Sequence, residues 1–214
     1  MKPPTTELAQ AAARLVVEEG LEYGAAKRRT VRQLGGTRGA ARGAWPSSED
    51  VEDAVREYLA IYCADTQPAE LRALRGLALR WMARLADFRP HLSGAVWRGT
   101  ATRLSDVHLD LYCDDPKALE IALINQGIDY ESGLEPSSHP GHRGEPVHVL
   151  SLAEYCVELR ETVALQLAVR DFEDLRGALK PDARGRSWRG DASALRRLLE
   201  SSEAPGSGDA GVPR

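Results

Sequence analysis

Residues 93–110 read SGAVWRGTATRLSDVHLD. From residue 106 to residue 113 polar and apolar residues alternate strictly, which is the period of a strand buried on one face. The alternation places Asp106, His108 and Asp110 on one face and the apolar residues 107, 109 and 111 on the other. This stretch therefore predicts a half-buried strand whose polar face begins at Asp106.

Helices and strands are expected to alternate around this strand, as judged from apolar spacing and from the Gly and Pro residues that end each pattern. In chain order we expect a helix over 69–88, a strand over 91–97, the strand over 106–113, a helix from Pro116 to Gly127, a short strand from Ile128, a loop over 132–144, strands over 147–152 and 162–169, and two helices capped by Asp171 and Asp191.

The N-terminal third shows only helical patterns. Helices are expected over 7–19 and 22–34 and, after a glycine-rich loop over 35–47, from the N-cap Ser48 to Tyr62. The fold class predicted is therefore α/β (α+β), a mixed sheet with helices that follows an N-terminal helical region. We expect a helical region and linker over 1–46, a sheet domain over 47–200 and a disordered tail over 201–214.

Composition narrows the class of protein. The chain has 214 residues and a net charge of −4, so no global charge demands a nucleic-acid or membrane partner. It has no apolar run long enough for a membrane span, and its N-terminus lacks the apolar core of a signal peptide. Three cysteines without a CxxC pair favour free thiols in a reducing compartment. These features predict a cytoplasmic protein.

The stretch 93–110 also resembles the signature of nucleotidyltransferases of the DNA polymerase beta superfamily. Gly94 matches the family glycine of a Gly-Ser turn, and Ala95 stands where the family has serine. Arg98 and Gly99 match the Arg-Gly that follows in minimal members. Ser105 and Asp106 match the Ser-Asp that opens the acidic strand. The resemblance covers roughly residues 69–152 and implies a nucleotidyltransferase-like fold.

The resemblance implies roles for residues of this sequence. Asp106, His108 and Asp110 are the candidate catalytic residues, and the divalent metal, Mg²⁺ or another ion, would be held by Asp106 with His108 and His148. The third family carboxylate lies on a later strand, where His148 or Glu145 are the candidates. The nucleotide-binding residues it implies are Gly94, Ala95, Arg98, Gly99, Arg103 and Ser105. A nucleoside triphosphate is the implied ligand.

Two departures from the family pattern leave the activity open. Magnesium prefers hard oxygen ligands, and His108 stands where a carboxylate is expected. Ala95 has no hydroxyl to offer a phosphate. The site can be catalytically inactive but bind a nucleotide, it can use a transition metal, or Asp110 can take over a ligand role. The alternatives are thus a divergent nucleotidyltransferase and an inactive interaction module with the same fold.

Two basic segments suggest further partners. No acid interrupts the six basic residues between Tyr23 and Ser48, a possible phosphate or nucleic-acid surface: Lys27, Arg28, Arg29, Arg32, Arg38 and Arg42. A second basic group surrounds Trp188 and suits a triphosphate and a stacked base: Arg176, Lys180, Arg184, Arg186 and Arg189. For both groups a solvated surface is the alternative.

The N-terminal helices give a rival class. Residues 11–35, AAARLVVEEGLEYGAAKRRTVRQLG, are similar in rhythm to the opening helices of TetR-type regulators, which place a helix-turn-helix there. That family is all-helical, which the alternating stretch 106–113 argues against. A TetR-like DNA-binding regulator is therefore the last alternative.

Overall fold

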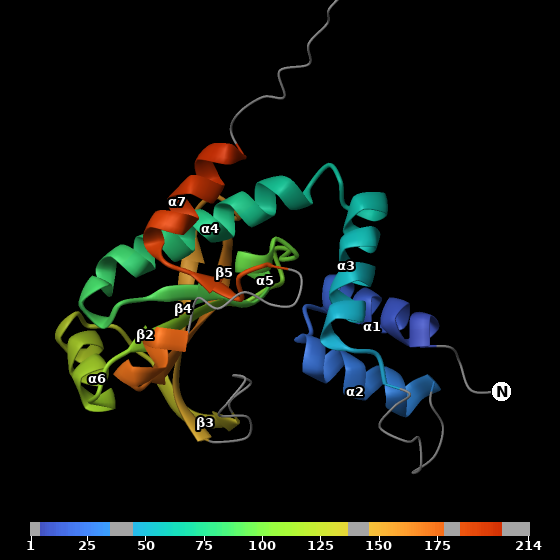
Figure 1. Cartoon of the computed structure of the whole chain (residues 1–214). Coiled ribbons are helices and arrows are strands. Elements are labelled where there is room, and N and C mark those ends of the chain that lie inside the picture. Colours follow the sequence, from blue (N-terminus) through green and yellow to red (C-terminus); the bar gives the residue numbers. More distant parts are fainter. Residues whose placement is uncertain (1–4, 35–44, 137–145, 178–184, 203–214) are drawn as a thin grey trace, which may run out of the picture.

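The computed structural model describes residues 5–34, 45–136, 146–177 and 185–202. These ranges contain a six-stranded mixed sheet with helices packed on it and a group of N-terminal helices beside it (Figure 1). The predicted α+β class, a mixed sheet preceded by a helical region, is confirmed. None of the described helices is long and apolar enough to cross a lipid bilayer.

The sheet has the strand order β3-β4-β5-β2-β1-β6. Its strands are β1 (His91–Ser93), β2 (Val107–Tyr112), β3 (Glu131–Pro136), β4 (Pro146–Cys156), β5 (Glu161–Arg170) and β6 (Arg189–Gly190). The pairing of β2 with β5 is parallel, whereas the other four pairings are antiparallel. The strand predicted over 106–113 therefore lies inside the sheet, between β1 and β5.

The main core lies between the sheet and the helices that cover one of its faces. These are α4 (Gln67–Arg84) and α7 (Ala192–Ser201), which lie side by side over the sheet in Figure 1, with α6 (Pro116–Asn125) at one end. Leu74 and Leu77 of α4 pack in one cluster with Leu109 and Leu111 of β2 and Leu167 of β5. The apolar face of β2 thus points into this core, as its alternation requires.

The N-terminal helices have a core of their own. Helices α1 (Thr5–Glu19), α2 (Tyr23–Leu34) and α3 (Ser48–Tyr62) share a buried cluster that includes Val16, Val51 and Val55. We call these three helices, together with residues 20–22 between α1 and α2, the N-terminal unit. The boundary expected at residue 46 stays a prediction, but the buried cluster joins α3 to α1 and α2 rather than to the sheet.

Several predicted boundaries need correction. The run 91–97 is not one strand, because the chain turns at Gly94, with φ of 67°, and continues as the short helix α5 (Gly94–Arg98). The N-cap of α3 is Ser47 rather than Ser48, since its hydroxyl accepts from the backbone N–H of Asp50. The strand expected from Ile128 begins at Glu131 and takes up part of the expected loop, whose remainder lies outside the described residues.

At the C-terminal end, the helix expected after Asp171 is a 3₁₀ helix, η3 (Phe172–Gly177), and Asp191 caps α7 as predicted. Strand β6 was not predicted, because two residues are too few to show a period. Most of the expected tail lies outside the described residues. The predicted free thiols are confirmed, since Cys63, Cys113 and Cys156 are all unbridged.

Gly190 of β6 gives a test of this packing. A Cβ atom added there would lie 2.0 Å from the ring of Trp97, so Gly190→Ala must displace a packed indole. Overpacking of this kind costs about 1–3 kcal/mol. We expect urea denaturation to show a loss in that range, whereas Gly133→Ala on the edge strand β3, where nothing lies within 4 Å, should change stability by less than about 0.5 kcal/mol. Equal losses in the two variants would contradict the packing.

Candidate functional site

The turn between β1 and α5 lies directly against β2. Ser93 is paired with His108 in the β1–β2 ladder, and the next residue, Gly94, has a positive φ. A Cβ atom at Gly94 would lie 3.2 Å from Cδ2 of His108. Glycine is therefore needed at this bend, both for its backbone conformation and for its close approach to the polar face of β2.

Asp106, the residue before β2, is held by a short chain of hydrogen bonds. The side-chain amide of Gln166 on β5 donates to Oδ2 of Asp106 at 3.1 Å, and the hydroxyl of Ser151 on β4 donates to Oε1 of Gln166. Strand register places Gln166 beside His108 and Ser151 beside Gln166. Three strands thus combine to orient one carboxylate on the polar face.

His108 is paired with the N-terminal unit. Its Nε2 lies 3.1 Å from Oε1 of Glu22, the residue that precedes α2. Burial alone would lower the pKa of His108, but the hydrogen bond to Glu22 and the charges of Glu22, Asp106 and Asp110 raise that pKa above its ordinary value of 6.5. The same hydrogen bond lowers the pKa of Glu22. The pair is therefore favoured as imidazolium and carboxylate.

Asp110 is neutralised inside the protein. It is 3% exposed, forms an ion pair with Arg170 of β5, and lies 3.1 Å from Nη1 of Arg189 of β6. Arg189 also donates to the hydroxyl of Tyr112 at 2.7 Å. Asp110 lines a cavity on the polar face of β2, but the expectation that it takes over a metal-ligand role is wrong, because two guanidinium groups occupy its carboxylate.

A cavity of about 110 Å³ opens on this same face of the sheet. Aliphatic residues of β4 and β5 line it together with six polar or charged residues, two of them acids: Ser93, His108, Asp110, Glu135, Gln166 and Arg170. Its volume is well below that of a typical small-molecule pocket. Only part of a nucleotide-sized ligand would fit inside.

His148 does not join Asp106 and His108. Register pairs His148 with Val169 of β5, which is paired with the core residue Leu111, so His148 lies on the helix-covered face of the sheet. There its Nε2 lies 3.2 Å from the hydroxyl of Ser132 and 3.5 Å from Oε1 of Glu120. The predicted metal set of Asp106, His108 and His148 is thus not formed.

No other set replaces it within the part of the chain that the structure describes, where no three His, Cys, Asp or Glu side chains are grouped to hold a metal ion. Glu145, the other candidate for the third carboxylate, lies outside the described residues. On the neighbouring strand β5, the residue paired with His108 is Gln166, whose side chain is a neutral amide.

The residues predicted to bind the nucleotide divide into those that shape the backbone around α5 and those whose polar side chains contact other parts of the protein. Gly94 and Gly99 have positive φ values at the two ends of α5, and Ala95 packs against the core. Arg103 is paired with Glu161, and the hydroxyl of Ser105 accepts from the backbone N–H of Thr102. The turn is formed as predicted, but the polar side chains that follow it make contacts within the protein.

Arg98 is bound to Glu52 of α3, a residue that sequence patterns did not single out. Nε and Nη2 of Arg98 donate to one carboxylate oxygen at 3.0 and 2.7 Å. Arg56 and Arg186 donate to the other oxygen at 2.8 and 3.0 Å. Burial raises the pKa of Glu52, but the hydrogen bonds and charges of Arg98 and Arg56 outweigh burial and lower it below 4.5. Glu52 is therefore ionised in the folded protein at neutral pH.

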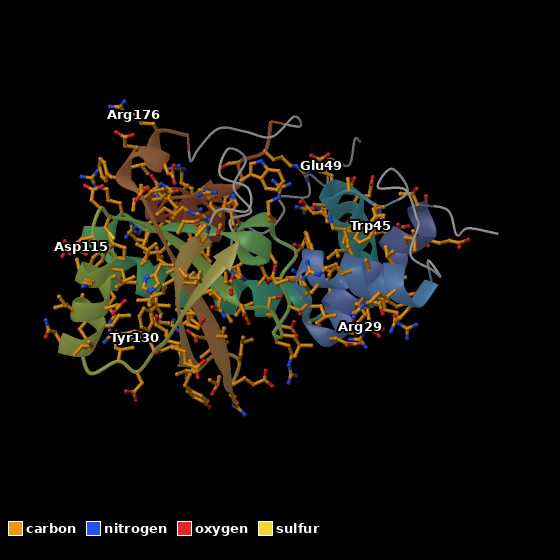
Figure 2. The ribbon with its side chains drawn as sticks, turned by 90° about the horizontal axis from the view of Figure 1, so that it is seen from below. Arg29, Trp45, Glu49, Asp115, Tyr130 and Arg176 are labelled. Carbon is orange, nitrogen blue, oxygen red and sulfur yellow. The ribbon has the colours of Figure 1, made fainter. Side chains whose placement is uncertain are left out.

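The two predicted basic surfaces are partly used by internal contacts. On α2, Lys27 donates to Ser48 and Arg29 is paired with Glu19, while Arg28 and Arg32 are exposed. Arg176 lies at the opposite end of the molecule from Arg29 (Figure 2). Arg186 of the second group, by contrast, contacts Glu52 of α3. The other basic residues of these groups, Arg38, Arg42, Lys180 and Arg184, lie outside the described residues.

Comparison with known proteins identifies no family. No protein-family model matches the chain. No curated protein matches it either. Two solved structures of the Cid1 poly(U) polymerase are similar, one bound to MgGTP (12% identity, TM-score 0.34) and a mutant bound to MgATP (16% identity, TM-score 0.32). Each likeness covers 58% of this chain and 39% of the polymerase chain, so the chain spans about two fifths of the polymerase's length.

The contact between Glu22 and His108 predicts a pH-dependent contribution to stability. A histidine whose folded pKa is raised contributes stability that is complete below its unfolded pKa and is lost as pH rises through the folded pKa. Glu22 is exposed, so solvent screening limits the pair to about 0.5 kcal/mol. Glu22→Gln should cost about this much at pH 6 and nothing measurable at pH 9.

Histidine NMR checks the same contact directly. In Glu22→Gln the pKa of His108 should fall, whereas the control Glu57→Gln, which removes an exposed acid from α3, should leave it unchanged. A His108 pKa that is the same in wild type and Glu22→Gln would show that the contact does not form in solution.

Proposed function

We propose that the chain is a nucleotide-binding protein with a nucleotidyltransferase-like core and without the two-metal chemistry of nucleotidyl transfer. One observation carries this proposal. The Gly94 turn lies against the polar face of β2, where Asp106, His108 and Asp110 are the expected site residues. His108 is paired with Glu22 and Asp110 with Arg170, whereas the carboxylate of Asp106 accepts a hydrogen bond from the neutral amide of Gln166.

The donor set supports one metal ion at most. Two-metal transfer needs carboxylates that bridge and position both ions. Here His108 is bound to Glu22, Asp110 is bound to Arg170 and Arg189, and the neighbouring strand presents an amide. Mg²⁺ that arrives with a nucleotide needs only one or two carboxylates in addition to the phosphates. Asp106 fits that requirement and would hold such an ion, which would neutralise phosphate charge.

The same face offers contacts for phosphates. His108 lies beside the exposed Gly94 bend, and its raised pKa favours the imidazolium form. Ser93 and Arg170 line the adjoining cavity. Binding through these groups requires no transfer step, so the proposal favours the inactive, nucleotide-binding alternative over a divergent transferase.

Binding of nucleic acid stays a prediction, which rests on four basic residues of α2: Lys27, Arg28, Arg29 and Arg32. The TetR-like alternative is wrong for the chain as a whole, because a six-stranded sheet fills its middle and C-terminal parts. That class is all-helical, and here only the N-terminal unit lacks strands.

A thermal-shift series with nucleoside triphosphates, with and without Mg²⁺, tests the proposal. At ten times the dissociation constant a ligand adds about 1.4 kcal/mol, which raises the melting temperature of a chain this size by about 3–6 °C. We expect that shift with Mg²⁺ in the wild type and its loss in Asp106→Asn, because the amide cannot supply the charge that Mg²⁺ needs.

Asp129→Asn is the matched control, since it removes an exposed carboxylate from the loop before β3 and should keep the full shift. A parallel assay with labelled nucleotide should show no transfer product. If the wild type bound no nucleotide, the proposed function would be refuted. If it showed turnover that depends on Asp106, the proposal that the protein is catalytically inactive would be refuted.

A further inference from the structure

Three arginines from three separate parts of the chain converge on the carboxylate of Glu52. Arg56 comes from the same helix, Arg98 from the end of α5, and Arg186 from the segment before β6. The Glu52 side chain is 3% exposed, and that of Arg98 is 6% exposed. A buried carboxylate pairs with guanidinium groups in the way a phosphate does, since both offer negatively charged oxygens to the planar fork of donors on a guanidinium.

An aromatic ring completes this cluster. The guanidinium carbon of Arg98 lies 4.7 Å from the ring centre of Trp188, and Trp188 is 37% exposed. The indole N–H of Trp97 donates to the backbone carbonyl of Ser187 at 2.9 Å, which holds the segment in place. A cation stacked on a partly exposed indole is a surface that suits the phosphates and the base of a nucleotide.

A second acid of the N-terminal unit, Glu22, also contacts the stretch 93–110. Glu22 is bound to His108, as Glu52 is bound to Arg98, so two acids of the unit occupy two cations of the stretch 93–110. Between the unit and the sheet domain the contacts include the hydrogen bonds from Arg56 to the Arg98 carbonyl and between Tyr23 and Thr100. The two buried clusters are separate, and polar interfaces of this kind permit relative motion of their partners.

We propose that Arg98 and Arg186, with Trp188, form an oligophosphate-binding site whose anion position Glu52 fills in this structure. The N-terminal unit then competes with the triphosphate of a nucleotide for these arginines. Binding of the triphosphate displaces Glu52 and loosens the unit from the sheet domain. This inference goes beyond the proposed function, because it assigns a set of phosphate contacts outside the Asp106 face and the element that controls access to them.

Calorimetry with inorganic triphosphate in the presence of EDTA tests the competition without any metal. Glu52→Gln removes the competing charge, and we expect it to bind triphosphate at least tenfold more tightly than the wild type. Glu57→Gln removes an exposed charge from the same helix and should change the affinity less than twofold. In Glu52→Gln combined with Arg98→Ala the gain should disappear. Equal gains in Glu52→Gln and Glu57→Gln, or no gain in either, would overturn the proposal.

A comparison of ATP with inorganic triphosphate separates a nucleotide ligand from a free oligophosphate. If the base stacks on Trp188, ATP binds Glu52→Gln more tightly than triphosphate does, and Trp188→Ala removes that difference. Equal affinities for the two ligands would overturn the nucleotide assignment of this site.

Glu52→Gln leaves buried arginines without their carboxylate and can fail to fold, so a measurement on the wild type stands beside it. Hydrogen exchange followed by mass spectrometry should show faster exchange in α3 when triphosphate is added, because displacement of Glu52 loosens that helix. Unchanged or slower exchange would overturn the proposal. These assays contain no metal, so their failure would not count against the proposed Mg²⁺-dependent binding through Asp106. Conversely, failure of the Mg²⁺-dependent binding would not decide the outcome of these assays.

Discussion

The parallel pairing of β2 with β5 is the constraint on which the site depends. It places Gln166 beside His108 and within reach of Asp106, and it brings Arg170 to Asp110. A parallel pair needs a long crossover, here the segment that contains α6, β3 and β4. The polar face of β2 is therefore surrounded by residues that lie far away along the chain.

Charge neutralisation is the common feature of this region. A metal centre keeps carboxylates uncompensated until the ion arrives, whereas here acids and bases are already matched: His108 with Glu22, Asp110 with Arg170, and Arg98 with Glu52. A buried charge without a partner costs several kcal/mol, so these pairs stabilise one arrangement of the chain. In the proposed competition, an anionic ligand exchanges places with Glu52, which would couple ligand binding to the position of the N-terminal unit.

Much of the fold could be predicted, and the candidate site only in part. The alternation over 106–113 and the helical spacing before it led to the correct strand and helix, because each depends on residues two to four positions apart. The turn at Gly94 followed only from the family resemblance, since the apolar run 91–97 by itself predicted one strand. His148 was assigned to the wrong face, since its strand was recognised but its register was not. Glu52 had one signal that sequence reasoning missed: an acid among Val51, Val55 and Leu59 on the apolar face of its helix.

The amino-acid order alone determined most of the local elements and the polar face that starts at Asp106. Only the tertiary structure decided which partners those side chains have. Gln166 is 60 residues from Asp106, Glu22 is 86 from His108, and Arg186 is 134 from Glu52. Periodicity carries no information over such separations, because contacts between distant segments follow from how sheet and helices bury their apolar faces together.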